Sequence, residues 1–349
     1  MKENRSLLSE PEGGFRVVVP EPDESVRGYM YRLSEAYGLP SVRTLLGQIR
    51  VSGPRPFSTA CVALLAELGG VSRESLLNLT GFDPNYCGGV SVWRFGCDNT
   101  SHFPAVNCRV LPICCECLAD RVTASGFVPG FVHLAAMTAC PLHGCVLLKV
   151  CPYCDLPLRS DRARLYSCGC RGALDRVATK KASPGELTFA SAVYARISGT
   201  RTQASVLNSA SGQLDLAALT LDDLVYLQWA LGHVLPHPLP SALGSRRHLS
   251  AAQSLSATLA CVDLLSEPTA VVPMVQAWLR FFSDRFGPEV VLPFGLFRSV
   301  LKRLVRMQGI PKIAELISSE MEVLSSRHHF RPAVGPRSPA QLSLFGSDA

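Results

Sequence analysis

The chain has 349 residues, of which 47% are hydrophobic, and a formal net charge of +6 at pH 7. This length predicts two or three domains, and the hydrophobic content is sufficient to bury substantial cores. No apolar run approaches the length of a membrane span, so we expect no membrane association. The modest positive charge permits contact with nucleic acid without requiring it.

Residues 1–14 are predicted to be a disordered lead. The stretch from Met1 to Pro20 is charged and has no apolar core of the length that a secretory signal needs. We therefore expect a reducing, cytoplasmic compartment in which thiols stay free or bind metal.

Residues 15–107 are predicted to form an N-terminal helical domain. Asp23 is a candidate cap for a first helix that ends at Gly38, and Ser41 is a candidate cap for a second. A helix-turn-helix-like pair follows over residues 59–68 and 72–79.

The second helix of this pair is poorly suited to reading bases. It carries Arg73 next to Glu74 and little else that would reach a base edge. An ordinary helical hairpin is the alternative, and we favour a packing or protein-binding role for the pair.

Two blocks of cysteine and histidine dominate residues 108–182, which we interpret as tandem zinc-binding modules. The first block, spaced C-x2-C-x22-C-x2-H, comprises Cys114, Cys117, Cys140 and His143. The second block, spaced C-x2-C-x13-C-x-C, comprises Cys151, Cys154, Cys168 and Cys170. Two close ligand pairs joined by a loop are typical of a closed tetrahedral zinc site, so we predict two structural zinc ions.

Alternatives to zinc are disulfides, an iron–sulfur cluster, a redox dithiol and a chance grouping of buried cysteines. Cysteines without a partner at ligand spacing fit the last of these: Cys61, Cys87, Cys97, Cys108, Cys145 and Cys261. Cys115 is predicted to be a spectator, because Cys114 gives the usual spacing to Cys117. Gly169 is expected to permit the tight turn between the last two ligands. The apolar segment 128–139 is expected to pack against the first block as a helix or strand.

A cluster of cations lies in and just after the second block. Its members are Arg159, Arg162, Arg164, Arg171, Arg176, Lys180 and Lys181. Cations on a rigid zinc module suit contacts with a nucleic-acid backbone, and a merely solvated face is the alternative.

Residues 183–326 are predicted to form a C-terminal helical domain. Thr220 is a candidate helix cap, and further helices are expected over residues 250–266, 269–286, 294–308 and 311–325. One of them carries a basic face for nucleic acid or an acidic partner, comprising Arg298, Lys302, Arg303 and Arg306.

The tail over residues 327–349 is rich in Pro, Ser and Arg and is predicted to be disordered. It ends in a pentapeptide similar to the motif by which bacterial repair and replication proteins bind the sliding clamp. The residues expected to contact the clamp are Gln341, Leu342, Leu344 and Phe345. The alternative is that the apolar residues fold back onto the protein's own surface.

The order of these features resembles the TniQ family of transposition target-site selectors, which includes TnsD-like proteins. The resemblance covers about residues 15–175. It is carried by the segments PEPDES at 20–25, GY at 28–29, RL at 32–33, CPLHG at 140–144 and CPYC at 151–154. It implies a mainly α fold with two small zinc-ribbon or zinc-finger modules between the two helical domains.

The resemblance further implies a non-catalytic adaptor in a bacterial, nucleoid-associated setting. Its expected partners are an AAA+ ATPase, a transposase, and a target that is either DNA or a CRISPR RNA-guided complex. A second copy of the chain is a further candidate partner.

Two other functions compete with the adaptor. A nuclease or transposase needs clustered carboxylates that hold Mg²⁺, and no such cluster is evident. No phosphate-binding loop of an ATPase is present in the sequence. A stand-alone zinc-containing DNA-binding transcription regulator is the second alternative, which the helix-turn-helix-like pair favours.

Overall fold

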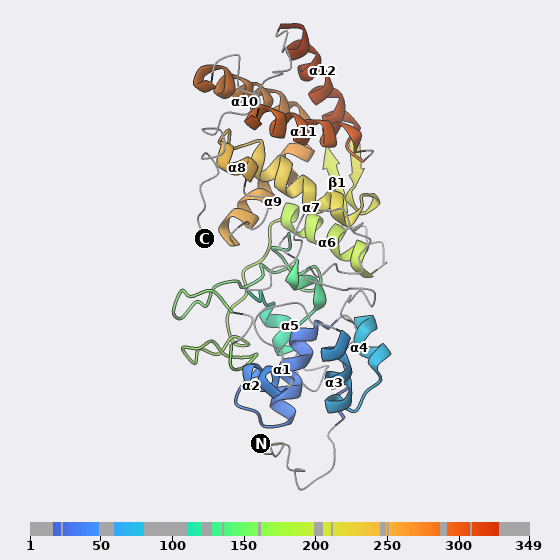
Figure 1. Ribbon diagram of the computed structural model, residues 1–349, viewed down its shortest axis with the longest axis vertical. Coiled ribbons are helices and arrows are strands. Elements are labelled where there is room, and N and C mark those ends of the chain that lie inside the picture. Colours follow the sequence, from blue (N-terminus) through green and yellow to red (C-terminus); the bar gives the residue numbers. More distant parts are fainter. Residues whose placement is uncertain are drawn as a thin grey trace, which may run out of the picture.

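The described part of the chain is long and mainly helical. The computed structural model describes residues 17–21, 24–48, 59–79, 110–120, 128–134, 136–159, 162–198, 205–210, 212–244, 249, 251–286, 292–307 and 309–327. The N-terminal helices lie at one end, the cysteine-rich segment lies in the middle, and the C-terminal helices lie at the other end (Figure 1). The predicted fold class, mainly α with two cysteine-rich modules, is confirmed.

The N-terminal part contains four helices. They are α1 (Val26–Ala36), α2 (Val42–Gln48), α3 (Thr59–Gly69) and α4 (Arg73–Leu79). Helix α1 contacts both α2 and α3, and α3 contacts α4. The helices predicted from the spacing of apolar residues are therefore present in the predicted order.

The capping residue of α1 differs from the prediction. The hydroxyl of Ser25 accepts a hydrogen bond from the backbone N–H of Gly28 at 2.8 Å, and the predicted cap Asp23 lies outside the described residues. Ser25 has the extended backbone conformation of an N-cap, so its side chain reaches the first turn. The helix is followed by Gly38, with φ of +62°, and Ser41 caps α2 as predicted.

Tyr29 fixes the turn between α3 and α4 against α1. A Cβ atom on Gly69 would lie 1.8 Å from the Tyr29 hydroxyl oxygen, so the close approach requires glycine there. The same hydroxyl donates a hydrogen bond to the carbonyl of Val18 at 3.0 Å. Gly70 adopts φ of +62°, and Ser72 caps α4.

The middle of the described chain has little regular structure. It contains the short helix α5 (Cys115–Ala119) and the 3₁₀ helix η1 (Gly130–His133), and the remaining order comes from isolated bridges such as Ile113 with Leu148. Of the helix or strand predicted over residues 128–139, only the four-residue η1 is present among the described residues, and the segment packs in the core as expected. Glycine and proline at its start favour a turn over a longer element.

The C-terminal part is a bundle of helices with one hairpin. Its elements are α6 (Pro184–Ser198), β1 (Val206–Ser209), β2 (Gly212–Asp215), the 3₁₀ helix η3 (Leu216–Ala218), α7 (Leu221–Trp229), the π-helix η4 (Ala230–Val234), α8 (Pro240–Gly244), α9 (Ala251–Ser266), the 3₁₀ helix η5 (Pro268–Ala270), α10 (Val271–Phe286), α11 (Leu292–Arg306) and α12 (Pro311–Arg327). The predicted helices are present, and Thr220 caps α7. The antiparallel β1–β2 hairpin was not predicted, because strands of four residues carry little periodicity.

A single apolar core runs through the described residues from the N-terminal helices to α12. In the C-terminal part it is centred on Trp278, whose ring stacks on Phe297 at 4.7 Å between centroids. The indole N–H of Trp278 donates to the carbonyl of Val234 at 2.9 Å, which satisfies its buried polar group.

The middle segment is bonded to both ends of the molecule. The backbone N–H of Ser25 donates to the carbonyl of Val128 at 2.7 Å. On the other side, the side chain of Gln228 on α7 donates to the carbonyl of Ala136 at 3.3 Å and also to groups on α9. These buried bonds join the cysteine-rich segment to the helices on either side of it.

Among the described residues, no single helix has the length and apolar character of a membrane span. One pair, Gln253–Ser266 with Pro268–Phe282, meets the length and composition criteria together, with a bend of 114° at its break.

Candidate metal centres and charged surfaces

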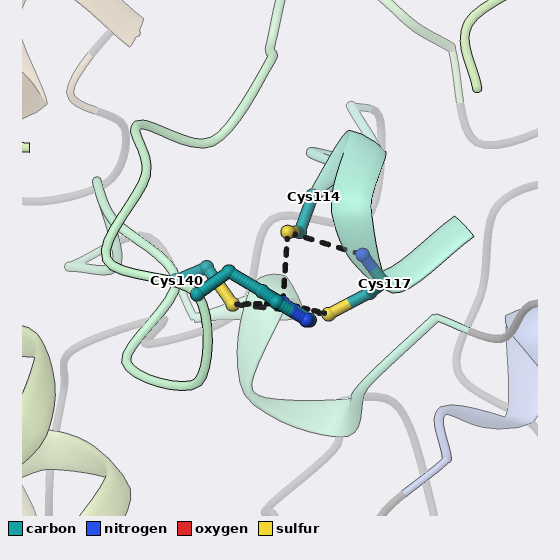
Figure 2. A group of neighbouring side chains, drawn as sticks. Cys114, Cys117 and Cys140 are labelled. Carbon is teal, nitrogen blue, oxygen red and sulfur yellow. Dashed lines mark hydrogen bonds between the residues drawn. The ribbon is translucent and has the colours of Figure 1, made fainter. Parts of the chain in front are cut away.

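The first candidate metal site is built by a helix start facing a tight turn. Cys114 caps α5, and its sulfur accepts a hydrogen bond from the backbone N–H of Cys117 at 3.3 Å. This places both cysteines at the first turn of the helix, while Cys140 lies on the facing loop (Figure 2). His143 follows on the same turn as Cys140 and completes the predicted group.

The four ligand atoms have the separations of a tetrahedral site. The imidazole Nδ1 of His143 lies 3.4 Å from Cys114 Sγ, 3.2 Å from Cys117 Sγ and 3.6 Å from Cys140 Sγ. The sulfurs of Cys117 and Cys140 are 3.8 Å apart. Zinc–sulfur bonds of about 2.3 Å in a tetrahedron put two sulfurs about 3.8 Å apart, so the arrangement fits one ion.

The second predicted group has the same geometry with four sulfurs. Cys151 Sγ lies 3.7 Å from Cys170 Sγ, and Cys154 Sγ lies 3.7 Å from Cys168 Sγ. All four sulfurs lie within 4.8 Å of one another. Cys151 is buried and Cys170 is exposed, so this group lies nearer the surface than the first.

The turns that hold these ligands depend on left-handed residues at unexpected positions. Asp155 follows the ligand Cys154 with φ of +55°, and Arg171 follows the last ligand, Cys170, with φ of +70°. Gly169 was expected to permit the tight turn between Cys168 and Cys170. A Cβ atom added to Gly169 would meet nothing within 4 Å, and its φ is not in the left-handed region, so the turn does not require glycine there. Arg171 is therefore the residue that takes the strained conformation.

Each group offers four protein ligands of the kind that zinc prefers, and both can hold a metal ion. Four protein ligands leave no open position for a reacting water, which is typical of structural sites. The ligands predicted from spacing are the ones that the fold brings together.

Two other cysteines differ from each other in their surroundings. Cys115 lies beside the first site but outside the ligand group, and burial raises the pKa of its thiol to about 11. Cys145 was predicted to have no partner, yet its sulfur lies 3.4 Å from Cys114 Sγ. The sequence did not predict this contact, because the spacing between Cys145 and the other cysteines is not one that is typical of metal ligands.

The cations near the second site divide into exposed and buried members. The exposed ones are Arg159, Arg164, Arg171, Arg176, Lys180 and Lys181, and we call them the zinc-module cations. Arg162 is buried and donates hydrogen bonds to the carbonyls of Leu165 and Arg159. It is therefore built into the fold and lies outside this surface.

One residue of the basic face predicted on α11 is also not part of the exposed surface. Arg298, Lys302 and Arg306 are exposed. Arg303 instead forms an ion pair with Asp222, and its guanidinium lies over the Tyr226 ring at 4.0 Å from the centroid. A cavity of about 320 Å³ between α11 and α12 is lined by Lys302, Val305, Arg306, Ser318, Met321 and Glu322.

Tyr153 is a surface residue that the sequence did not single out. Its side chain is exposed, and a Cβ atom on Gly172 would lie 2.2 Å from the ring, so the ring lies against that glycine. The hydroxyl donates to the carbonyl of Ala173 at 3.2 Å. The ring of Tyr153 therefore covers Gly172 at the surface of the second site. Some predicted residues lie outside the described part of the chain. They are the clamp-like residues Gln341, Leu342, Leu344 and Phe345, and the cysteines Cys87, Cys97 and Cys108.

Comparison with known proteins bears on the segment that contains the first site. Residues 15–147 match the model of the TniQ family. This segment is a TniQ domain. The resemblance to this family that the sequence predicted is confirmed for these residues. No curated protein matches the sequence.

The TniQ match includes the first metal site and ends before the second. The resemblance had been expected to extend to about residue 175, so the second site and the zinc-module cations lie outside the matched segment. Apolar residues around the second site, such as Leu158 and Leu174, nevertheless belong to the same core as the TniQ domain.

Proposed function

We propose that the chain is a non-catalytic target-selection adaptor for DNA transposition. It links a target, either a DNA site or a CRISPR RNA-guided complex, to an AAA+ ATPase and a transposase. The TniQ match over residues 15–147 carries this proposal. The two closed ligand sets support it, because they are suited to holding structural zinc rather than a reacting water.

An adaptor must keep its binding surfaces in fixed relative positions. The cysteine-rich segment is joined to α1 through Ser25 and Val128, and to α7 through Ala136 and Gln228. Two structural zinc ions in this segment would hold together a stretch that has few regular elements of its own. The metal sites therefore support a scaffold role.

The zinc-module cations are the proposed contact with the target. Against these six exposed cations, the acidic residues of described positions 151–182 are Asp155 and Asp175. Such a surface suits contacts with phosphate, which position a protein on nucleic acid without reading its sequence. The exposed row Arg298, Lys302 and Arg306 on α11 is a second proposed surface, for nucleic acid or an acidic partner.

The test is an affinity purification of the full chain from cells that carry the neighbouring transposon genes, with nucleic acid retained. We expect an AAA+ ATPase to be recovered, with or without a guide RNA complex, together with about two zinc ions per chain. The chain recovered alone on one DNA site would contradict the adaptor role.

A matched pair of variants separates the target contact from the scaffold. Arg164→Ala and Arg176→Ala together remove two exposed cations, and Glu67→Ala with Glu74→Ala removes two exposed acids from the N-terminal helices. The first pair should reduce retained nucleic acid and flatten its salt dependence, with zinc content unchanged. An equal effect of both pairs would argue against the proposed surface.

The second candidate function is a stand-alone DNA-binding transcription regulator. The α3–α4 pair favours it, because a Ser72-capped helix follows a glycine turn and exposes Arg73. A footprint on one promoter that is lost in an Arg73→Ala variant would support this function over the adaptor.

A further inference from the structure

The first metal site has one more sulfur than a four-coordinate ion uses. The sulfurs of Cys114, Cys117 and Cys140 form one face of the site, and Nδ1 of His143 lies 3.2–3.6 Å from all three. Cys145 Sγ lies 3.4 Å from Cys114 Sγ, which is closer than the sulfur pairs Cys117–Cys140, Cys151–Cys170 and Cys154–Cys168, at 3.7–3.8 Å. The sulfurs of Cys114, Cys117 and Cys140 therefore have two candidates for the fourth ligand, His143 and Cys145.

The backbone holds Cys145 in place independently of the His143 side chain. The carbonyl of Cys145 accepts a hydrogen bond from the N–H of Cys140 at 2.7 Å, and Gly144 between the two ligands donates to the Cys140 carbonyl at 2.9 Å. Cys145 also pairs with Lys181 in an isolated bridge. Removal of the imidazole would leave these bonds intact.

The surroundings of Cys145 distinguish it from an ordinary buried thiol. Its side chain is buried at 2% exposure, as is that of Cys261 at 0%, but the sulfur of Cys145 lies beside a sulfur of the ligand group, that of Cys114. Two sulfurs bound to one zinc ion lie about 3.8 Å apart, so Cys145 is near enough to Cys114 to share an ion with it, while it lies outside the group of four atoms that are all within 4.8 Å of one another. To take the place of His143, the side chain of Cys145 has to turn toward the ion.

We propose that Cys145 is a reserve metal ligand that replaces His143. In the exchange, the bond from the metal to His143 Nδ1 breaks and a bond to Cys145 Sγ forms. The thiol proton of Cys145 passes to the freed imidazole or to water, and no electron is transferred. Zinc accepts both sets, Cys₃His with His143 and Cys₄ with Cys145.

This inference concerns metal retention and does not depend on the proposed function. A second ligand set keeps the ion bound when the turn that carries His143 opens, and His143 is the least buried ligand of the first site. The second site offers no such reserve among the described residues, because no fifth sulfur is placed beside its four.

The test measures zinc per chain and the Co²⁺ spectrum in the full-length protein. His143→Ala should keep about two zinc ions per chain, whereas His143→Ala with Cys145→Ala should keep about one, held by the second site. Cys145→Ala alone should keep about two. With Co²⁺, His143→Ala should give stronger thiolate charge-transfer absorption than the natural chain, because four thiolates replace three.

Matched controls exclude a general effect of removing a cysteine. His143→Ala with Cys115→Ala removes a neighbouring buried cysteine and should still retain about two zinc ions. Cys170→Ala should reduce zinc to about one, because the second site has no reserve. Loss of one zinc ion or of folding in His143→Ala alone would overturn the proposal, as would full retention in His143→Ala with Cys145→Ala.

Discussion

The guanidinium of Arg162 lies over the ring of Tyr31, 5.2 Å from its centroid. Tyr31 belongs to α1, and Arg162 lies between the two knuckles of the second metal site, so this contact joins parts of the chain that are 131 residues apart. Arg162 also satisfies the buried carbonyl of Leu165 with two hydrogen bonds. A residue that resembles a phosphate contact in the sequence is therefore part of the core.

Arg162→Ala should destabilise the fold, because it removes the cation–π contact and leaves the Leu165 carbonyl without its partner. We expect a loss of about 2–4 kcal/mol in the free energy of unfolding, measured with urea. Arg164→Ala, two residues away and exposed, should change stability by less than about 0.5 kcal/mol. Similar losses in the two variants would refute the structural role of Arg162.

Cys114→Ala with Cys145→Ala should remove one metal ion and weaken the fold, because the pair takes away a ligand that also caps α5 together with the reserve sulfur beside it. Metal binding and folding are coupled at such sites, so the thermal midpoint should fall together with zinc content. Cys115→Ala is the matched control, and it should keep about two zinc ions per chain. Elemental analysis of the purified variants measures both outcomes, and a zinc loss in Cys115→Ala would show that the ligand assignment is wrong.

Gly232→Ala should disrupt the contact between the π-helix η4 and α9. A Cβ atom there would lie 1.8 Å from the backbone carbonyl oxygen of Ala257, and neither backbone can yield without moving its helix. We expect a loss of about 2 kcal/mol or more in the free energy of unfolding. Gly295→Ala on α11 meets nothing within 4 Å and should stabilise the chain by about 0.5–1 kcal/mol. Unfolding curves that show equal effects would contradict this packing.

Glu24 should make stability fall as the pH rises toward neutrality. Its carboxyl is fully buried, and burial raises its pKa from the ordinary value of 4.5 to about 7, despite the cation of Arg32 at 3.2 Å. Between these values the folded chain holds a proton that the unfolded chain has released, so this contribution is present below about pH 4.5 and is lost as the pH rises through about 7.

Glu24→Gln should remove this pH dependence. The free energy of unfolding of the natural chain relative to the variant should therefore decline between pH 5 and pH 8, by at most about 3 kcal/mol. Comparison of two variants at each pH cancels the effect of ligand protonation at the metal sites. Glu67→Gln, an exposed change on α3, is the control. A constant difference between the natural chain and Glu24→Gln would contradict the shifted pKa.

The sequence determined those features that depend on neighbouring residues. Apolar spacing and capping residues such as Ser41 and Thr220 predicted the helices, because a cap and an amphipathic stripe act within one or two turns. Both ligand sets were predictable for the same reason, since each knuckle is a local turn of fixed spacing. The TniQ motifs lie in these local elements.

The tertiary structure decided which side of the protein each charged or sulfur-bearing group faces. Arg162 and Arg303 resemble their exposed neighbours in sequence, but Tyr31 and Asp222 that hold them are far away along the chain. Cys145 has no ligand spacing, and only the folded loop brings its sulfur to Cys114. Burial and pairing are set by contacts distant in sequence, so they are settled only when the whole core packs.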